Sequence, residues 1–233
     1  MKTLAHKQSD AQPVSWAPVY QALREAIISH QIPPGTKLPE DELSSIYSVG
    51  RALIRPALQA LAHDKLVRLE PNRGAFVAQP SKQEAREIFE ARALIEPKVA
   101  ALAAQVATPA AIKELRLHLE HEHSATQAHD DGAAIKLSAG FHMAIADIAA
   151  HSIFASYVYD LLSRSSLIVA LYWKRRDATC ESHAHHALVE AIANHKPDDA
   201  ANLMRSHLVD LLSGLDLELV SKQDRTLSDM LRK

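Results

Sequence analysis

The sequence predicts a mainly α-helical chain in two parts, a turn-rich N-terminal unit and a C-terminal antiparallel all-helical bundle. Eight of the 11 prolines lie at or before Pro80, so the first 80 residues should turn often. Beyond Pro80, apolar residues recur every three or four positions, which is the spacing of helices packed side by side. A chain of 233 residues, at about 150 per domain, also favours two modest domains.

Composition excludes several classes of protein. Hydrophobic residues make up 47% and charged residues 23%, which is typical of a folded globular chain. The longest apolar run, 167–173, is far shorter than the roughly 20 residues of a membrane-spanning helix. The N-terminus has no apolar signal core, and the single Cys180 excludes an intrachain disulfide. A cytoplasmic location, with no membrane partner, is therefore expected.

Charge is distributed unevenly along the chain. The overall net charge of -2 excludes a uniformly basic nucleic-acid coat. Residues 1–80 hold nine Lys/Arg and seven Asp/Glu, a net charge of +2, which leaves -4 for residues 81–233. This sign suits a DNA-reading domain over 16–80 on an acidic body over 81–221. Residues 1–15 and 222–233 are expected to be polar tails, the first of them disordered.

The N-terminal unit begins with two predicted helices. A first helix from about residue 16 is indicated by four apolar residues at helical spacing, and it ends before the turn dipeptide at 34–35. A second, short helix over 39–47 is expected to bury Leu43 and Ile46. The four residues of the first helix are Tyr20, Leu23, Ile27 and Ile28.

A third helix is predicted from Arg51 to about His63. Gly50 is an acceptable N-cap, although it offers no capping side chain. Pro56 removes one backbone donor near the sixth helical position, so a slight kink after Arg55 is expected, and not loss of the helix. The inward face should consist of Leu53, Ala57, Leu58 and Leu61.

Two short strands complete the N-terminal unit. Residues 66–70 and 75–78 flank a tight four-residue turn, which predicts a β-hairpin. Three helices followed by a hairpin are the winged helix-turn-helix arrangement, in which the second helix of the helix-turn-helix enters the DNA major groove.

The third helix carries two arginines suited to reading bases. Arg51 and Arg55 are four residues apart, so both project from one face near the helix N-terminus. An arginine fork can bond to the O6 and N7 of guanine. In the hairpin turn, Arg73 beside the small Gly74 can reach a minor groove or a phosphate. The alternative interpretation is that these arginines form only a solvated surface.

Residues 19–78 closely resemble the DNA-binding domain of GntR-family bacterial transcription regulators. The family pattern PG-x-x-L-x-E appears at 34–40, V-S-R-x-x-V-R-x-A-L appears as VGRALIRPAL over 49–58, and a G-L-V…G-x-F-V pattern as KLVRLEPNRGAFV. The resemblance implies a dimer on a palindromic operator, with Arg51 and Arg55 on bases. It also implies that Arg24, Arg73 and Gly74 meet the DNA backbone or groove.

The C-terminal part is predicted to contain six helices, over about 82–106, 109–129, 132–150, 152–175, 181–195 and 197–219. Thr108 before Pro109 is a favourable helix start, since it joins a capping side chain to a first-turn proline. The region resembles the all-helical FCD effector-binding domain of the FadR-type branch. The matching residues lie at 90–104, 141–146, 185–192 and 204–208.

That second resemblance implies a divalent metal held by His142, His185 and His207. Three neutral imidazoles suit Zn or Ni and leave coordination positions open. The family's aspartate, four residues before the first histidine, is here Ser138, a neutral side chain. An effector is therefore expected to complete the metal coordination, unless nearby Cys180, His183 or His186 substitutes.

Arg92 is a further candidate, because a guanidinium clamps carboxylates bidentately and many relatives sense organic acids. A salt bridge with Glu96, four residues on, is the alternative. The histidines at 118, 121, 123 and 129 do not share one helix face, so they are interpreted as solvated surface. Cys180 is interpreted as a plain thiol.

Two classes of function compete at this point. A ligand-responsive, dimeric transcription regulator with an organic-acid effector is favoured, and no enzymatic activity is expected. The alternative is a His-rich bundle acting as a metalloenzyme or metal-binding protein. No G-x-S-x-G motif occurs, and Glu120-x-x-His123 lacks the second copy that a di-iron bundle needs.

Overall fold

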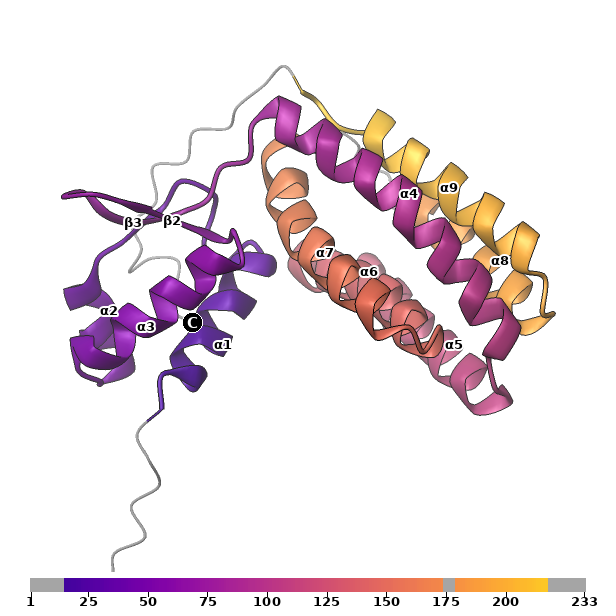
Figure 1. Cartoon of the computed structure of the whole chain (residues 1–233), viewed down its shortest axis with the longest axis horizontal. Coiled ribbons are helices and arrows are strands. Elements are labelled where there is room, and N and C mark those ends of the chain that lie inside the picture. The colour runs from indigo at the N-terminus through magenta and orange to yellow at the C-terminus, as the bar shows by residue number, and fades with distance from the viewer. Residues whose placement is uncertain (1–14, 174–178, 218–233) are drawn as a thin grey trace, which may run out of the picture.

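The computed structural model describes residues 15–173 and 179–217, which form an N-terminal domain and a helical bundle joined at one end (Figure 1). Of the two predicted polar tails, residues 1–14 and residues 222–233 lie outside these ranges. Within the described residues, no helix is both long and apolar enough to cross a membrane.

The N-terminal domain is a winged helix-turn-helix, as predicted. Its elements are α1 (Ala17–Ile28), β1 (Lys37–Leu38), α2 (Glu40–Tyr47), α3 (Arg51–His63), β2 (Val67–Glu70) and β3 (Gly74–Val77). The strands form an antiparallel sheet in the order β1-β3-β2, with Arg68 opposite Phe76 and Lys37 on its other side. The short β1 was not predicted, because two residues are too few to show an alternating pattern.

The domain's core corrects two sequence predictions. On α3, Ile54 is fully buried and Leu53 only half-buried, so the inward face begins one residue later than predicted. On α2, Leu43 is buried but Ile46 is 40% exposed. Leu43 is the one residue of this eight-residue helix that is fully buried. The helix α3 runs unbroken through Pro56, with Gly50 as an N-cap that makes no side-chain bond.

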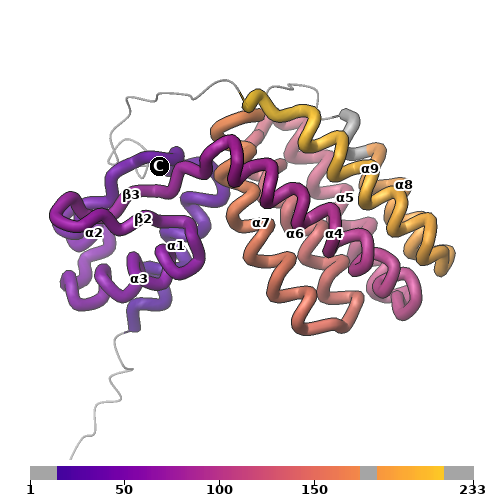
Figure 2. The backbone as a smooth tube through the Cα atoms, turned by 45° about the horizontal axis from the view of Figure 1, so that its top comes forward, coloured from indigo at the N-terminus to yellow at the C-terminus, as the bar shows by residue number. Residues whose placement is uncertain are grey.

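The bundle contains six helices within the described residues, in the predicted order. They are α4 (Lys82–Val106), α5 (Pro109–Gln127), α6 (Asp131–Ile148), α7 (Ser152–Tyr172), α8 (Thr179–Ala193) and α9 (Pro197–Ser213). Helices α4 and α9 run side by side in both Figure 1 and Figure 2. Ser81 and Glu84 form a capping box at the start of α4, and Thr108 caps α5.

All of the bundle helices except α4 end earlier than predicted, and two of them do so by more than two residues. Helix α7 ends at Tyr172 and not 175, and α9 ends at Ser213 and not 219. The chain leaves both helices where Trp173 and Leu215 form an isolated antiparallel bridge. A Cβ at Gly214 would lie 3.0 Å from the Trp173 ring, so a larger residue here would require the ring to shift by a few tenths of an ångström.

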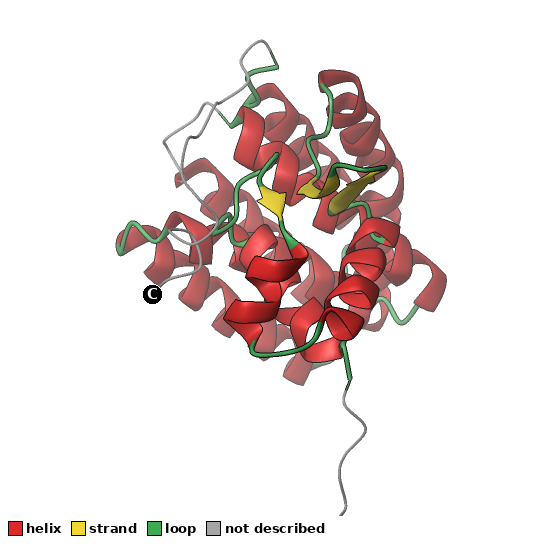
Figure 3. Ribbon diagram, turned by 90° about the vertical axis from the view of Figure 1, so that its left-hand side faces the viewer, coloured by secondary structure: helices red, strands yellow, loops and turns green. Residues whose placement is uncertain are grey.

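The two domains touch beyond their connecting peptide. The Tyr172 hydroxyl donates a 2.9 Å hydrogen bond to the Pro80 carbonyl oxygen, which ties the linker between β3 and α4 to α7. Leu167 of α7 is buried in the apolar cluster of the N-terminal domain. Figure 3 looks onto the N-terminal domain with the bundle behind it.

Candidate metal centre and nucleic-acid interface

Three buried histidines from three helices meet inside the bundle. His142 lies on α6, His185 on α8 and His207 on α9, and each is at most 4% exposed. The Nε2 atom of His207 lies 3.1 Å from Nε2 of His185 and 3.3 Å from Nε2 of His142. The structure thus brings together the three side chains that the sequence predicted.

The spacing of these nitrogens fits a metal ion. Two Zn–N bonds of about 2.05 Å at a tetrahedral angle place their nitrogens about 3.3 Å apart. Without a metal, a hydrogen bond between two of these nitrogens requires a proton on one of them, which then cannot act as a lone-pair donor. Three protein ligands would leave a coordination position open, as in catalytic or ligand-binding metal sites.

Two glutamates fix the orientation of two of the imidazoles. Nδ1 of His142 is 2.6 Å from Glu96 Oε2, and Nδ1 of His185 is 3.0 Å from Glu122 Oε2. Both carboxylates are buried. When Nδ1–H donates to a carboxylate, the Nε2 lone pair faces the centre, which is the arrangement found around many protein-bound metals.

Electrostatics favour neutral, metal-competent imidazoles. Burial lowers the pKa of His142, and burial together with the neighbouring His185 lowers the pKa of His207 well below its ordinary value. Glu96 behaves differently, because Arg92 and His142 outweigh the effect of its burial and lower its pKa to about 2. The site therefore combines neutral nitrogens with an ionised carboxylate behind them.

Glu122 is a functional residue that the sequence analysis missed. It lies between the exposed His121 and His123, in a stretch interpreted as solvated surface. A signal was available, since Glu122 continues the buried face of α5 at helical spacing after Ile112, Leu115 and Leu119.

The other histidines of α5 follow the prediction with one exception. His121, His123 and His129 are exposed, but His118 is half-buried, with Nε2 2.7 Å from the Leu137 carbonyl oxygen. The prediction for His118 was wrong because α6 packs over that side of α5. The Cys180 side chain lies outside the described part of the chain, so its predicted role stays a prediction.

A cavity of about 620 Å³ adjoins the histidine cluster. His142 and Ser138 line it from α6, Glu122 from α5 and Arg92 from α4. Ser138, which lies one turn before His142, contributes a hydroxyl where a carboxylate was expected. The cavity wall is completed largely by α7, through Leu162, Ser165, Ser166, Val169 and Ala170.

Arg92 forms the salt bridge that the sequence offered as the alternative to an effector clamp. The side chain is 3% exposed, and Nε lies 2.5 Å from Glu96 Oε1. Because the other oxygen of Glu96 faces His142, the three side chains form one buried chain of charge and hydrogen bonds. Arg92 also lines the cavity, so the salt bridge and a ligand contact are compatible.

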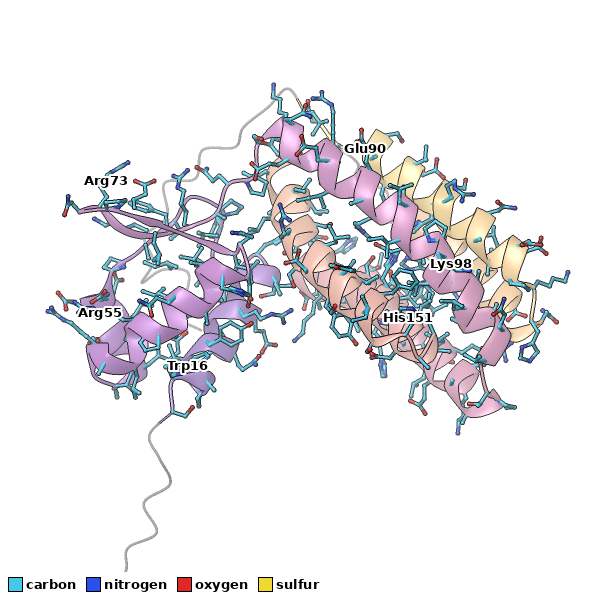
Figure 4. All side chains as sticks on the ribbon, viewed as in Figure 1. Trp16, Arg55, Arg73, Glu90, Lys98 and His151 are labelled. Atoms are coloured by element: carbon cyan, nitrogen blue, oxygen red, sulfur yellow. The ribbon has the colours of Figure 1, made fainter. Side chains whose placement is uncertain are left out.

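The candidate DNA-reading arginines lie on the side of the N-terminal domain away from the bundle. Figure 4 shows Arg55 and Arg73 at this outer edge. Arg51 is 58% and Arg55 62% exposed at the N-terminal end of α3. Arg73 is 71% exposed in the hairpin turn, next to Gly74, whose φ of +96° favours glycine.

Each α3 arginine is paired with an acidic residue of α2. The Arg55 Nε lies 2.9 and 2.8 Å from the two oxygens of Glu40, and Arg51 forms an ion pair with Asp41. In the hairpin, Arg73 pairs with Glu70 and stacks over the Phe76 ring at 5.5 Å. These pairs hold long side chains in defined positions on the exposed face.

Arg24 lies elsewhere in the structure. Its Nη2 donates a 2.9 Å hydrogen bond to Ser163 Oγ on α7, so the side chain faces the bundle. A DNA contact by Arg24, as the resemblance implied, would require this bond to break. The remaining four predicted DNA-contacting residues lie on the outer helix–hairpin surface.

Comparison with protein families assigns both halves of the chain. Residues 17–77 match the family described as bacterial regulatory proteins, gntR family, and residues 87–210 match the FCD domain. Two relatives are HTH-type transcriptional repressors. RspR of Escherichia coli K12 is 31% identical over 63% of this chain and 64% of its own length, and NanR of Enterobacter sp. 638 is 28% identical over 82% and 81%. The matched region thus spans less than two thirds of RspR.

Solved structures share the fold. E. coli McbR/YncC superposes with a TM-score of 0.76 at 20% identity, covering 86% of this chain and 96% of that one. The transcriptional regulator GntR from Rhodococcus sp. RHA1 superposes with a TM-score of 0.75 at 23% identity, covering 85% of this chain and 95% of that one. At this level of identity, the likeness concerns architecture alone.

Proposed function

Because the chain belongs to the GntR family of bacterial regulators and carries an FCD domain, we propose that it is a ligand-responsive transcription regulator that binds a palindromic operator as a dimer. The N-terminal domain would contact DNA through Arg51, Arg55, Arg73 and Gly74. The proposal includes no catalytic step, in keeping with the regulators to which the chain is similar.

The observation that carries the sensing half of the proposal is the histidine cluster at the cavity wall. His142, His185 and His207 would hold a divalent ion such as Zn or Ni through Nε2, with Glu96 and Glu122 behind them. When bound, such an ion supplies an electrophilic position that accepts an oxygen ligand. Ser138 and Arg92 line the same cavity and would contact the effector.

The open metal position and Arg92 favour a carboxylate as that effector. Arg92 and a divalent ion carry three positive charges against the three carboxylates of Glu96, Glu122 and Asp131, so net charge alone does not select the ligand. Ser138 adds no negative charge beside His142. One oxygen of a ligand carboxylate would occupy the open metal position, and the Arg92 Nη1, on the side not engaged by Glu96, would donate a hydrogen bond to the other.

Three measurements test this function. Selection from a random duplex library should recover a palindrome with two half-sites, and sedimentation of the untagged protein should give a dimer. Elemental analysis should find about one divalent ion per chain. Failure to select any DNA sequence would contradict the proposed regulator function. A metal-free protein that still selects a palindrome would contradict only the proposed metal site.

A further inference from the structure

The C-terminal end of α1 rests on α7, one of the two helices that form most of the cavity wall. The Arg24 Nη2 donates to Ser163 Oγ at 2.9 Å, and the His30 Nε2 lies 2.7 Å from the Ser166 carbonyl oxygen. Leu167, the residue after Ser166, is buried in the core of the DNA-binding domain. Three residues of α7 within little more than one helical turn, Ser163, Ser166 and Leu167, therefore contact the other domain.

The same end of α1 also contacts α6, the second cavity helix. A Cβ atom at Gly132 would lie 2.9 Å from the Ser29 carbonyl oxygen, a distance that real Cβ atoms do not tolerate. One turn later, Lys136 forms an ion pair with Glu25. The end of α1 thus bridges α6 and α7, and the glycine allows it to come this close.

The cavity lies between those two helices and includes a residue of the DNA-binding domain. Ile135 and Ser138 line it from α6, Ser165 and Ser166 from α7, and His30 lines it from the segment after α1. Burial lowers the pKa of His30, in keeping with an enclosed position. A molecule filling the cavity would therefore touch both domains.

We propose that the effector site is shared between the domains, with His30 as a ligand-contacting residue and the end of α1 as the element that senses the separation of α6 and α7. A ligand that changes this separation must move α1 or break its contacts, because packed interfaces switch between arrangements and do not stretch. Helix α1 packs on α3, which carries Arg51 and Arg55. The inference rests on the proposed function only in taking this cavity as the effector site.

An artificial occupant tests the inference without knowledge of the natural ligand. Ala170→Leu adds three carbons to the α7 wall of the cavity. Gly132→Ala should release α1 from α6 by the clash with Ser29, while alanine suits the helix itself. Gly140→Ala is the matched control, because it makes the same change on the same helix facing His118 and not the DNA-binding domain.

His30→Gly tests the ligand-contacting residue. His30 has a φ of +60°, which glycine adopts without strain, so this variant removes the imidazole and leaves the turn intact. With glycine at position 30, the cavity is larger and can accommodate part of the leucine side chain that Ala170→Leu introduces. The double variant is therefore expected to behave more like the wild type than Ala170→Leu does.

Two readouts separate the inference from the proposed function. Amide hydrogen exchange should rise over residues 25–32 in Ala170→Leu, and affinity for a duplex selected by the wild type should change by about fivefold or more. Gly132→Ala and His30→Gly should each reduce that affinity change below about twofold, and Gly140→Ala should leave it intact. Strictly additive effects, or unchanged exchange over 25–32, would overturn the shared site. Changed exchange in a protein that selects no DNA sequence would support the coupling and overturn the regulator.

Discussion

At the residue scale, Glu96 and Glu122 hold equivalent positions behind different histidines but have different partners. Glu96 is bonded both to His142 and to the Arg92 guanidinium, so its place is fixed from two sides. Glu122 faces His185 through one hydrogen bond. The orientation of His185 should therefore depend strongly on this single carboxylate.

Glu122→Gln is expected to lower zinc affinity by about 10- to 100-fold, the usual cost of losing a carboxylate behind a metal-binding histidine. The amide keeps the shape of the side chain but not its charge. Competition titration of the metal-free protein with a chromogenic chelator measures the change. Glu120→Gln, on the exposed face of the same helix, is the control, and equal affinities for the two variants would contradict an orienting role.

The metal-free bundle is expected to lose stability in mild acid. Burial lowers the pKa of His142 and of His207, whereas unfolded imidazoles protonate near pH 6.5. The unfolded state therefore binds more protons below that pH, and the free energy of unfolding must fall as the pH drops through 6.5 toward 5. Urea denaturation at pH 7.5, 6.5 and 5.5 measures this slope.

Replacement of one buried imidazole provides the check on that slope. His207→Gln removes one of the two cluster imidazoles whose pKa is lowered, so the loss of stability between pH 7.5 and 5.5 should become smaller. His121→Gln, at an exposed position, should leave it as in the wild type. A slope that responds equally to both substitutions would mean that the buried cluster is not its origin.

At the element scale, the helices followed from the sequence wherever a periodic apolar face and a breaker coincided. Thr108 before Pro109 placed the start of α5, and the three candidate ligand histidines followed from the family motifs. What could not be predicted depends on long-range contacts. The pairing of β1 with β3, the ends of α7 and α9 at the Trp173–Leu215 bridge, and Glu122 opposite His185 each require a partner distant in sequence.

The ion pairs between α2 and α3 predict that α2 takes part in DNA recognition. Both oxygens of Glu40 accept from the Arg55 Nε, and the described hydrogen bonds include none from the terminal nitrogens of that guanidinium, which we expect to contact a base. Glu40→Ala should lower the ratio of specific to nonspecific DNA affinity by about fivefold, roughly 1 kcal/mol of discrimination. Nonspecific affinity should rise, because a negative charge near the phosphates is lost.

Anisotropy titrations with a selected duplex and a scrambled duplex measure both quantities. Glu42→Ala is the matched control, since it removes the same charge from the same helical turn without an arginine partner among the described ion pairs. It should raise affinity for both duplexes alike. If Glu40→Ala does no more than this, Arg55 is not positioned by α2.

Pro56 weakens α3 from within. It lies at the sixth position of the helix, where an interior proline forgoes a backbone hydrogen bond. Pro56→Ala should raise the free energy of unfolding by about 1–3 kcal/mol, measured by chemical denaturation. Pro109→Ala, at the first position of α5, should change it by less than about 0.5 kcal/mol. Equal effects would show that α3 has already adapted to its proline.

At the scale of the whole molecule, the candidate metal centre and the candidate DNA-reading arginines lie at opposite ends of one contact path. The histidine cluster is buried in the bundle, the cavity joins it to the end of α1, and α3 presents its arginines on the far side (Figure 4).

The peptide between β3 and α4 sets a limit on how far the DNA-binding domain can travel. Residues 78–81 reach at most about 14 Å when fully extended, and Tyr172 holds the Pro80 carbonyl oxygen at one end. One turn of B-form DNA advances about 34 Å. If two bundles associate, each reading domain can tilt on its tether but cannot step to the next helical turn. The distance between the two half-sites is then fixed. An operator with 10 extra base pairs between its half-sites should bind the protein only as strongly as one half-site alone.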